Sequence, residues 1–144
     1  MVKMMTKKIE LSEDYKPSES EQYMNDKQLE YFRRKLLKWK MSLQEESTQA
    51  VEFLKKKNWK DPDISDRAAD EADVSFELRT QDRYRKLIAK IDAALERIEM
   101  GAYGYCEVSD DPIGLRRLEA RPIATLSIEA QEKHERFEKT HNED

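Results

Sequence analysis

Residues 29–53, LEYFRRKLLKWKMSLQEESTQAVEF, decide the fold of this 144-residue chain. Apolar side chains recur here at alternating spacings of three and four, the heptad pattern of a helix that pairs with another helix. The members of this stripe are Leu29, Phe32, Leu36, Trp39, Leu43, Ala50 and Phe53, with Glu46 at its one polar seam position. The pattern predicts a long amphipathic helix that begins at Asn25.

A second heptad stripe follows, polar near its start and strongly apolar toward its end. Its members are Val74, Glu77, Gln81, Tyr84, Ile88, Ile91, Leu95 and Ile98. The stripes are separated by NWKDPDIS (58–65), in which Pro62 biases Asp61 away from helical geometry. Two helices of about 30 residues, each about 45 Å long, joined by a short loop must fold back antiparallel. The sequence therefore predicts a coiled-coil hairpin whose tip lies near residues 58–68.

The second helix is expected to end near Met100, because Gly101 and Gly104 offer the positive-φ conformations of a helix stop. Short apolar alternations and Pro/Gly punctuation then predict compact turns or small strands. A last amphipathic stretch, residues 128–139, predicts a C-terminal helix with Ile128 and Phe137 facing inward.

The predicted fold class is mainly α, with the hairpin projecting from a small globular domain. Residues 1–24 form an N-terminal arm, residues 25–100 the hairpin, and residues 101–144 the globular region with its C-terminal helix. A globular unit of about 45 residues usually needs a metal, a disulfide or additional packing. We expect the N-terminal arm to supply that packing.

Composition excludes several classes of function. With 27 Lys and Arg against 31 Asp and Glu, the net charge of −4 gives no general attraction to DNA, so direct sequence-specific DNA binding is not expected. The chain has no long apolar run or secretory signal, which predicts a cytoplasmic protein that does not enter a membrane. No nucleotide-binding or hydrolase motif occurs and there are only two histidines, so the sequence does not predict an enzyme.

Three segments together are more discriminating than the heptads: EQYMNDKQLEYFRRKLLKW (21–39), DPDISDRAADEADVSFELRTQDRYRKLIAKI (61–91) and GAYGYCEVSDDPIGLRRLEARPIATL (101–126). They resemble the DksA/TraR family, most closely its DksA branch, over essentially residues 21–130. The resemblance implies a hairpin that enters the secondary channel of bacterial RNA polymerase. It also implies a regulator of transcription initiation that works with the alarmone ppGpp in the stringent response. We expect this regulator to be a monomer.

The family's tip motif falls on Asp63, Asp66 and Ala68. Two carboxylates three residues apart at the start of a helix form one acidic face, which the resemblance places toward the polymerase active site. Helix capping is the alternative, because Asp63 is a good N-cap and Asp66 suits the helix dipole. Both roles are compatible.

The family's zinc site is degenerate in this chain. Its four cysteine positions are occupied by Cys106, Ser109, Ser127 and Ala130. Structural zinc needs four good nitrogen or sulfur donors, and His134 and His141 come too late to replace the lost ligands in register. We therefore expect no zinc, a small buried Cys106, and apolar burial by Tyr103, Tyr105, Leu115, Leu118, Ile123, Leu126 and Ile128.

The resemblance also implies a ppGpp site shared with the polymerase, in which Leu87, Lys90 and Arg121 match family positions. A further basic position of the family is Gln131 here, which predicts weaker ppGpp synergy. The alternatives are an ordinary solvated helix face for Lys90 and a structural ion pair with Glu119 or Asp111 for Arg121.

Two other functions stay open at this level. A coiled-coil dimerisation protein would pair its heptad seams with a second copy and would not depend on the tip. A transcript-cleavage cofactor would use tip carboxylates to hold a Mg²⁺ ion in the polymerase active site. The DRAADE string (66–71) favours the initiation regulator.

Overall fold

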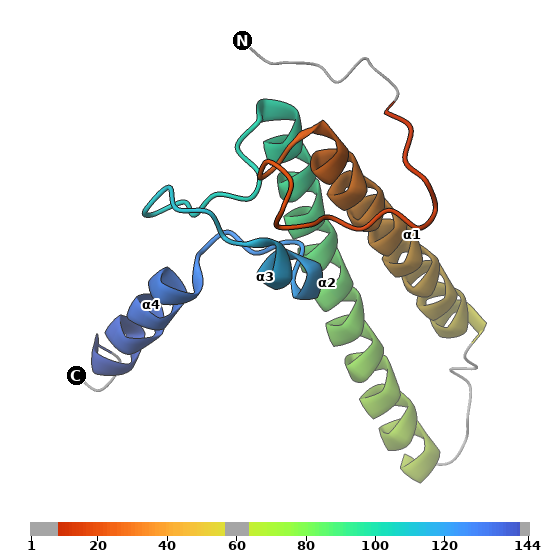
Figure 1. Ribbon diagram of the computed structural model, residues 1–144. Helices are drawn as coiled ribbons and strands as arrows, with labels where there is room; N and C mark the ends of the chain where they lie inside the picture. Colours follow the sequence, from red (N-terminus) through yellow and green to blue (C-terminus); the bar gives the residue numbers. More distant parts are fainter. Residues whose placement is uncertain (1–8, 57–63, 142–144) are drawn as a thin grey trace. The chain divides into compact units, whose positions relative to one another are not determined.

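The computed structural model describes residues 9–56 and 64–141, with the backbone alone for residues 64–67. Its helices are α1 (Asp26–Lys56), α2 (Ile64–Met100), α3 (Leu115–Ala120) and α4 (Ile128–His141) (Figure 1). Within these residues the only β structure is an isolated bridge between Tyr105 and Pro112. The predicted mainly helical fold is therefore confirmed. None of the described helices is both long and apolar enough to cross a membrane.

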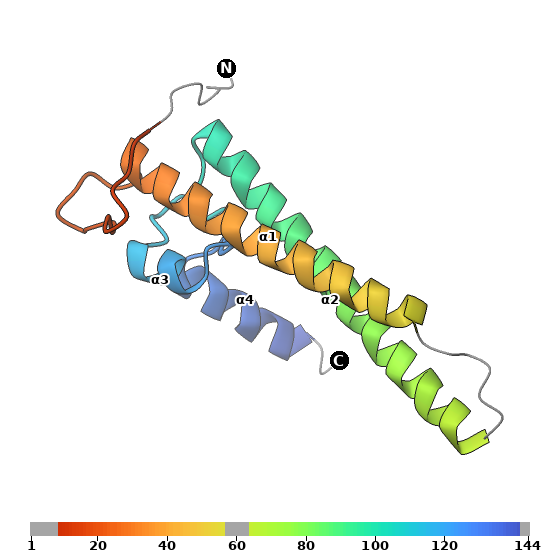
Figure 2. The same ribbon diagram turned by 90° about the vertical axis from the view of Figure 1, so that its right-hand side faces the viewer.

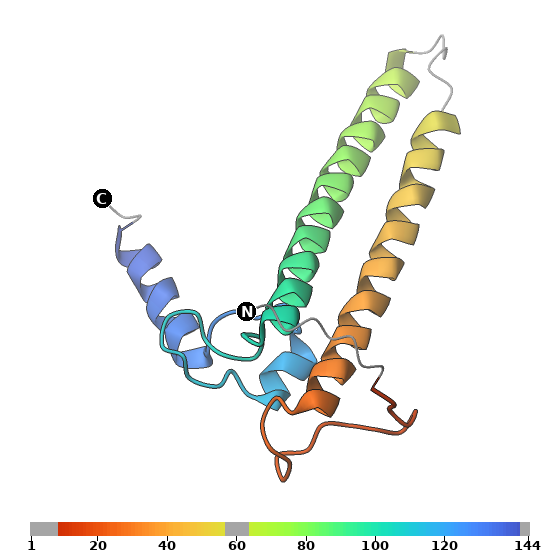
Figure 3. The same cartoon turned by 90° about the horizontal axis from the view of Figure 1, so that it is seen from above.

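The two long helices, α1 with 31 residues and α2 with 37, run antiparallel and lie side by side (Figures 2 and 3). The chain divides into two compact units that each contain a part of both helices. We call residues 37–92 the hairpin unit. Residues 1–36 and 93–144, which include both chain ends, form the terminal unit.

In the hairpin unit the contact between α1 and α2, which we call the seam, follows the second heptad stripe closely and the first stripe only in part. Leu43 is buried as predicted, and Glu46, although exposed, accepts a hydrogen bond from Tyr84 of the second stripe, as a polar seam residue would; Phe53, however, is 50% exposed. Ser47 also faces α2, where its Oγ donates to Gln81 Oε1 (2.5 Å) and its carbonyl accepts from Gln81 Nε2 (2.9 Å). On a straight helix, a stripe with a seven-residue repeat rotates around the helix axis by about 20° per heptad, so a stripe that starts in the seam gradually leaves it. This drift accounts for the exposure of Phe53, near the end of the first stripe.

The core of the terminal unit gathers around two aromatic side chains. Phe32 and Tyr103 are at most 1% exposed, with ring centroids 5.7 Å apart, and Leu118 of α3 is fully buried. Tyr103 donates its hydroxyl hydrogen to the carbonyl of Pro122 (2.8 Å), and burial raises the pKa of this phenol. These residues belong to α1, to the segment after α2 and to α3, so the core connects segments far apart in the sequence.

Polar contacts fasten α3 to α1 inside the terminal unit. Glu119 accepts hydrogen bonds from the Tyr31 hydroxyl and from Lys35 Nζ, both at 2.7 Å. Burial, together with the neighbouring Glu119 carboxylate, raises the pKa of Tyr31 to about 12. The α3 helix was not predicted, because the Pro/Gly punctuation on either side favoured turns, although LRRLEA itself consists of good helix formers.

The predicted inward face of the C-terminal helix is wrong. Ile128 and Phe137 are 53% and 59% exposed, and α4 contains no buried residue. The Phe137 ring stacks on His141, with centroids 3.8 Å apart. The helix has too few apolar residues to make a stripe, so its sequence pattern does not specify a packing face. Tyr105, also predicted in the core, is 38% exposed and packs edge-on against Tyr23.

The N-terminal arm is tied to the segment after α2 by a clamp formed by Tyr23. The Tyr23 hydroxyl donates to the carbonyl of Gly104 (2.7 Å) and accepts from the backbone N–H of Gly114 (2.9 Å). Gly104 has φ +92°, and a Cβ there would lie 2.8 Å from Met24 Cγ. Residue 104 must therefore be a glycine both for its conformation and for the close approach of the arm.

Candidate functional site

Most of the predicted hairpin tip lies outside the described residues. Asp63 is not described, and Asp66 is described only through its backbone, which lies in the first turn of α2. Ala68 is exposed on the same helix. The acidic tip face consequently stays a prediction.

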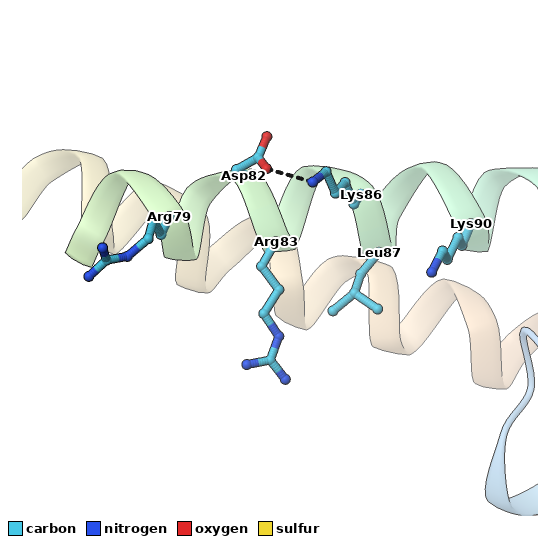
Figure 4. Close-up of a pocket in the computed structure, with 6 residues that line it drawn as sticks. All are labelled: Arg79, Asp82, Arg83, Lys86, Leu87 and Lys90. Carbon is cyan, nitrogen blue, oxygen red and sulfur yellow. Dashed lines mark ion pairs between the residues drawn. The ribbon is translucent and has the colours of Figure 1, made fainter. Parts of the chain in front are cut away.

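Leu87 and Lys90 lie together on a basic strip of α2, which also contains Arg79, Arg83 and Lys86. These residues and Asp82 surround a shallow depression of ≈ 390 Å³. Figure 4 shows Arg83, Leu87 and Lys90 projecting from the same side of α2, with Asp82 and Lys86 along its other edge. This arrangement presents positive charge beside one apolar side chain.

The charges of this strip are only partly neutralised. Asp82 forms ion pairs with Arg85 (2.7 Å) and Lys86 (2.9 Å), and the hydrogen bonds from these two cations lower the pKa of the Asp82 carboxyl. Within the described part of the chain, Arg79, Arg83 and Lys90 have no carboxylate within ion-pair distance. An anionic group approaching this side therefore meets unpaired cations.

Arg121 belongs to the terminal unit, whereas Leu87 and Lys90 belong to the hairpin unit. Its side chain is exposed and lines a depression of ≈ 590 Å³ beside α3. The alternative ion pair with Glu119 or Asp111 is not formed among the described residues, and Glu119 is instead bound by Tyr31 and Lys35. Arg121 is therefore available to a ligand.

The positions of the family's zinc ligands lie together around a single sulfur. Cys106 is 1% exposed, which agrees with its prediction as a small buried residue. Burial acts to raise the pKa of its thiol. This effect is outweighed by hydrogen bonds from the Ser109 hydroxyl and from the backbone N–H groups of Ser127, Ser109 and Val108. They lower the pKa to about 6. Hydrogen bonds from the protein itself thus surround the position where a metal would bind this sulfur.

The remaining ligand positions do not fit zinc. Ser127 Oγ accepts from the backbone N–H of Ala130 (3.2 Å) and thereby caps α4, while Ser109 Oγ accepts from the backbone N–H of Asp111 (3.4 Å). One thiol, two hydroxyls that are already hydrogen-bonded and a methyl group do not make the four nitrogen or sulfur donors of a structural zinc site. Among the described residues, no group of three or more His, Cys, Asp or Glu side chains is placed to hold a metal.

Main-chain hydrogen bonds hold this segment in the absence of four thiolates. Cys106 donates its N–H to the carbonyl of Asp111 (2.8 Å) and accepts from the N–H of Asp110 (3.0 Å). Glu107 donates to the carbonyl of Thr125 (2.9 Å), which connects the first half of the segment to the second. Of these bonds, the one between Glu107 and Thr125 joins the same two halves of the segment that the four ligand positions lie in.

Comparison with known proteins agrees with this architecture. Residues 28–98 match the family model described as DnaK suppressor protein DksA, N-terminal domain, and residues 101–136 match the prokaryotic dksA/traR C4-type zinc finger. The chain is 58% identical over 131 residues to a Caulobacter vibrioides protein named RNA polymerase-binding transcription factor DksA, covering 91% of this chain and 92% of that protein. The chain belongs to the DksA family.

Other members of the DksA family match nearly as fully. An Escherichia coli protein of the same name is 44% identical over 119 residues, which cover 83% of this chain and 79% of that protein. The solved structure of transcription factor DksA2 from Pseudomonas aeruginosa superposes with a TM-score of 0.75 at 41% identity, covering 81% of this chain and 90% of that chain. The paired long helices are thus a shared feature of the DksA family.

Metal removal should leave this DksA-family protein unchanged. We expect a chelator to shift its melting temperature by less than about 1 °C, because the side chains at the ligand positions do not fit zinc and a metal would then add no binding free energy to folding. The mass of the native protein should be that of the bare chain. The matched control is the triple variant Ser109→Cys, Ser127→Cys, Ala130→Cys, which should take up zinc and then lose stability when chelated. A chelator-sensitive wild-type protein would contradict the assignment.

Proposed function

We propose that this DksA-family protein is a transcription regulator that binds bacterial RNA polymerase. The observation that carries the proposal is 58% identity, over 91% of the chain, to a protein named as an RNA polymerase-binding transcription factor. The matched region includes both the paired helices and the degenerate finger. We propose a role in regulation and not in catalysis, because the relatives are named as transcription factors and the sequence carries no catalytic motif.

The proposed mode of action is insertion of the hairpin into the secondary channel of the polymerase. A pair of long antiparallel helices is suited to reach into a narrow channel, and α2 begins within the tip motif of Asp63, Asp66 and Ala68. The acidic tip would then act on promoter complexes near the active site. We propose that the protein is a monomer in the cytoplasm and needs no zinc. Residues 25–100 would form the inserting hairpin. Residues 1–24 and 101–144 would form the domain that carries it.

We further propose that the regulator acts together with ppGpp. Lys90 and Arg121 are exposed cations without a carboxylate partner among the described residues, and Leu87 lies beside Lys90 on α2. Charge-assisted hydrogen bonds from such groups to phosphate are strong. With polymerase groups completing the site, these three residues would contact the alarmone.

A reconstituted transcription assay tests the proposed function. Chelator-treated protein is added to purified RNA polymerase on a ribosomal-RNA promoter, with and without ppGpp. We expect the protein to lower transcription and ppGpp to deepen the effect. A protein that does not bind the polymerase would overturn the proposal. Cleavage of RNA in stalled complexes would favour a transcript-cleavage cofactor instead, and a dimer in solution without an effect on transcription would favour a coiled-coil dimerisation protein.

A further inference from the structure

The hairpin unit changes in character along its length. Near the limits of this unit, Leu43 and Ile91 of the two stripes are buried. Farther along both helices lie residues 44–56 and 68–90, which we call the distal hairpin. None of the described side chains in the distal hairpin is buried. Its seam therefore excludes water less completely than the seam at Leu43 and Ile91 does.

Polar groups occupy the middle of the seam in the distal hairpin. Ser47 and Gln81 are joined across it by two hydrogen bonds, of 2.5 and 2.9 Å, and Glu46 accepts another from Tyr84. Glu77 is the preceding member of the second stripe and is also polar. Such hydrogen bonds add little net free energy to pairing near water, because the same groups bind water when the helices part.

The large apolar side chains of the distal hairpin contribute little to its seam. Phe53 is 50% exposed on α1, and Phe76 and Leu78 are 59% and 57% exposed on α2. Burial of apolar surface is the main source of free energy for pairing two helices. The two helices of the distal hairpin are consequently held together more weakly than the same helices at Leu43 and Ile91.

Weak pairing has a consequence for the helices themselves. A helical segment of about 12 residues without a packing partner is only marginally stable in water, so each end of the distal hairpin depends on its neighbour. When the two helices part, both ends fray and their backbone hydrogen bonds open. The core of the terminal unit around Phe32 and Tyr103 does not depend on these contacts, because its residues lie outside the hairpin unit.

We propose that the distal hairpin is a compliant element, whose two helices part and pair again while the terminal unit stays folded, and which thereby adapts its shape to a binding partner. The hydrogen bonds between Ser47 and Gln81 are directional enough to form again between the same atoms, yet weak enough to open. The opening itself does not depend on the proposed function. Its adaptive role does, since the partner considered is RNA polymerase.

Hydrogen exchange of the complete protein, followed by mass spectrometry of its peptides, tests the opening. We expect backbone amides of the distal hairpin to exchange at least about tenfold faster than those around Leu36 and Ile98 in the same two helices. The double variant Ser47→Ala, Gln81→Leu replaces the polar pair with apolar side chains and should slow exchange in the distal hairpin several-fold.

The matched control for this double variant is Thr48→Ala, Arg85→Leu, which makes similar changes at exposed positions of the same helices. Alanine raises helix propensity at either position of α1, so a comparison of the two double variants isolates the effect of the seam. The control should exchange like the wild type. Uniform protection along α1 and α2 of the wild type would overturn the proposal. Equal slowing in both double variants would also overturn it, because helix propensity would then set the opening.

The rate of association with purified RNA polymerase tests the adaptive role. We expect Ser47→Ala, Gln81→Leu to associate several-fold more slowly than the wild type, because a firmly paired hairpin cannot change its shape on entry. The control variant should associate like the wild type. An unchanged rate in both variants would refute adaptation. A wild-type protein that does not bind polymerase at all would refute the proposed function together with the adaptive role, while the exchange experiment would still decide whether the distal hairpin opens.

Discussion

Asp66→Asn is expected to abolish the effect of this protein on transcription initiation while leaving its fold intact. The substitution keeps the size and polarity of the side chain but removes the negative charge from one of the two tip carboxylates. A charge-assisted contact is worth about 1.5–3 kcal/mol, or roughly a 10- to 150-fold change in an equilibrium constant. Inhibition of a ribosomal-RNA promoter should therefore fall by at least about tenfold at equal protein concentration.

The control for Asp66→Asn is Glu96→Gln, which removes an exposed carboxylate from the same helix outside the tip motif and the DRAADE string. This variant should regulate normally. The melting temperatures of both variants should stay close to that of the wild type, which separates a functional charge from helix capping. A normally active but destabilised Asp66→Asn protein would assign the carboxylate to capping alone.

Gly104→Ala is expected to destabilise the terminal unit more than any other glycine substitution that the described structure allows. The positive φ of +92° disfavours an alanine, at about 1–2 kcal/mol, and the new Cβ would meet Met24 Cγ at 2.8 Å. The arm would have to move away, which also breaks the hydrogen bond from Tyr23 to the Gly104 carbonyl. With about 3 kcal/mol lost in total, the melting temperature should fall by roughly 6–12 °C.

A matched control for Gly104→Ala is available in Gly101→Ala. Gly101 has φ +74°, but nothing lies within 4 Å of a Cβ built there, so this variant loses only the conformational preference. Thermal denaturation followed by circular dichroism should show a clearly smaller decrease for Gly101→Ala. Equal decreases would mean that the arm does not pack closely on residue 104, and the clamp would have no role in stability.

The long helices could be predicted from the sequence because their periodicity extends over many residues. Ile91 and Ile98 are buried as the second stripe predicts, and the helix ends at Met100, directly before Gly101 with its positive φ. Phe53 was misplaced because a heptad pattern records an average, whereas the helix rotates slowly relative to its partner. Periodicity is therefore a better guide to whether two helices pair than to where along the helices the pairing ends.

The site could be predicted only through residues that match family motifs. Lys90 and Arg121 were identified in this way, and both prove to be exposed cations. The different surroundings of Arg116 and Arg117 could not be predicted, because this basic pair resembles any solvated helix surface in sequence. Only the three-dimensional contacts distinguish the two, since Arg117 is bound to the Leu126 carbonyl and Arg116 is not. Likewise, no pattern indicated that backbone N–H groups would converge on Cys106.

The reciprocal hydrogen bonds between Ser47 and Gln81 also fix which residues of α1 and α2 stand opposite one another. Apolar seams alone tolerate sliding by one heptad, because leucine and isoleucine pack against many partners with similar free energies. A slide here would leave the Gln81 amide without its donor and acceptor inside the seam, where an unpaired polar group costs about 1–3 kcal/mol. This single pair thereby gives the two helices of the hairpin unit one preferred alignment.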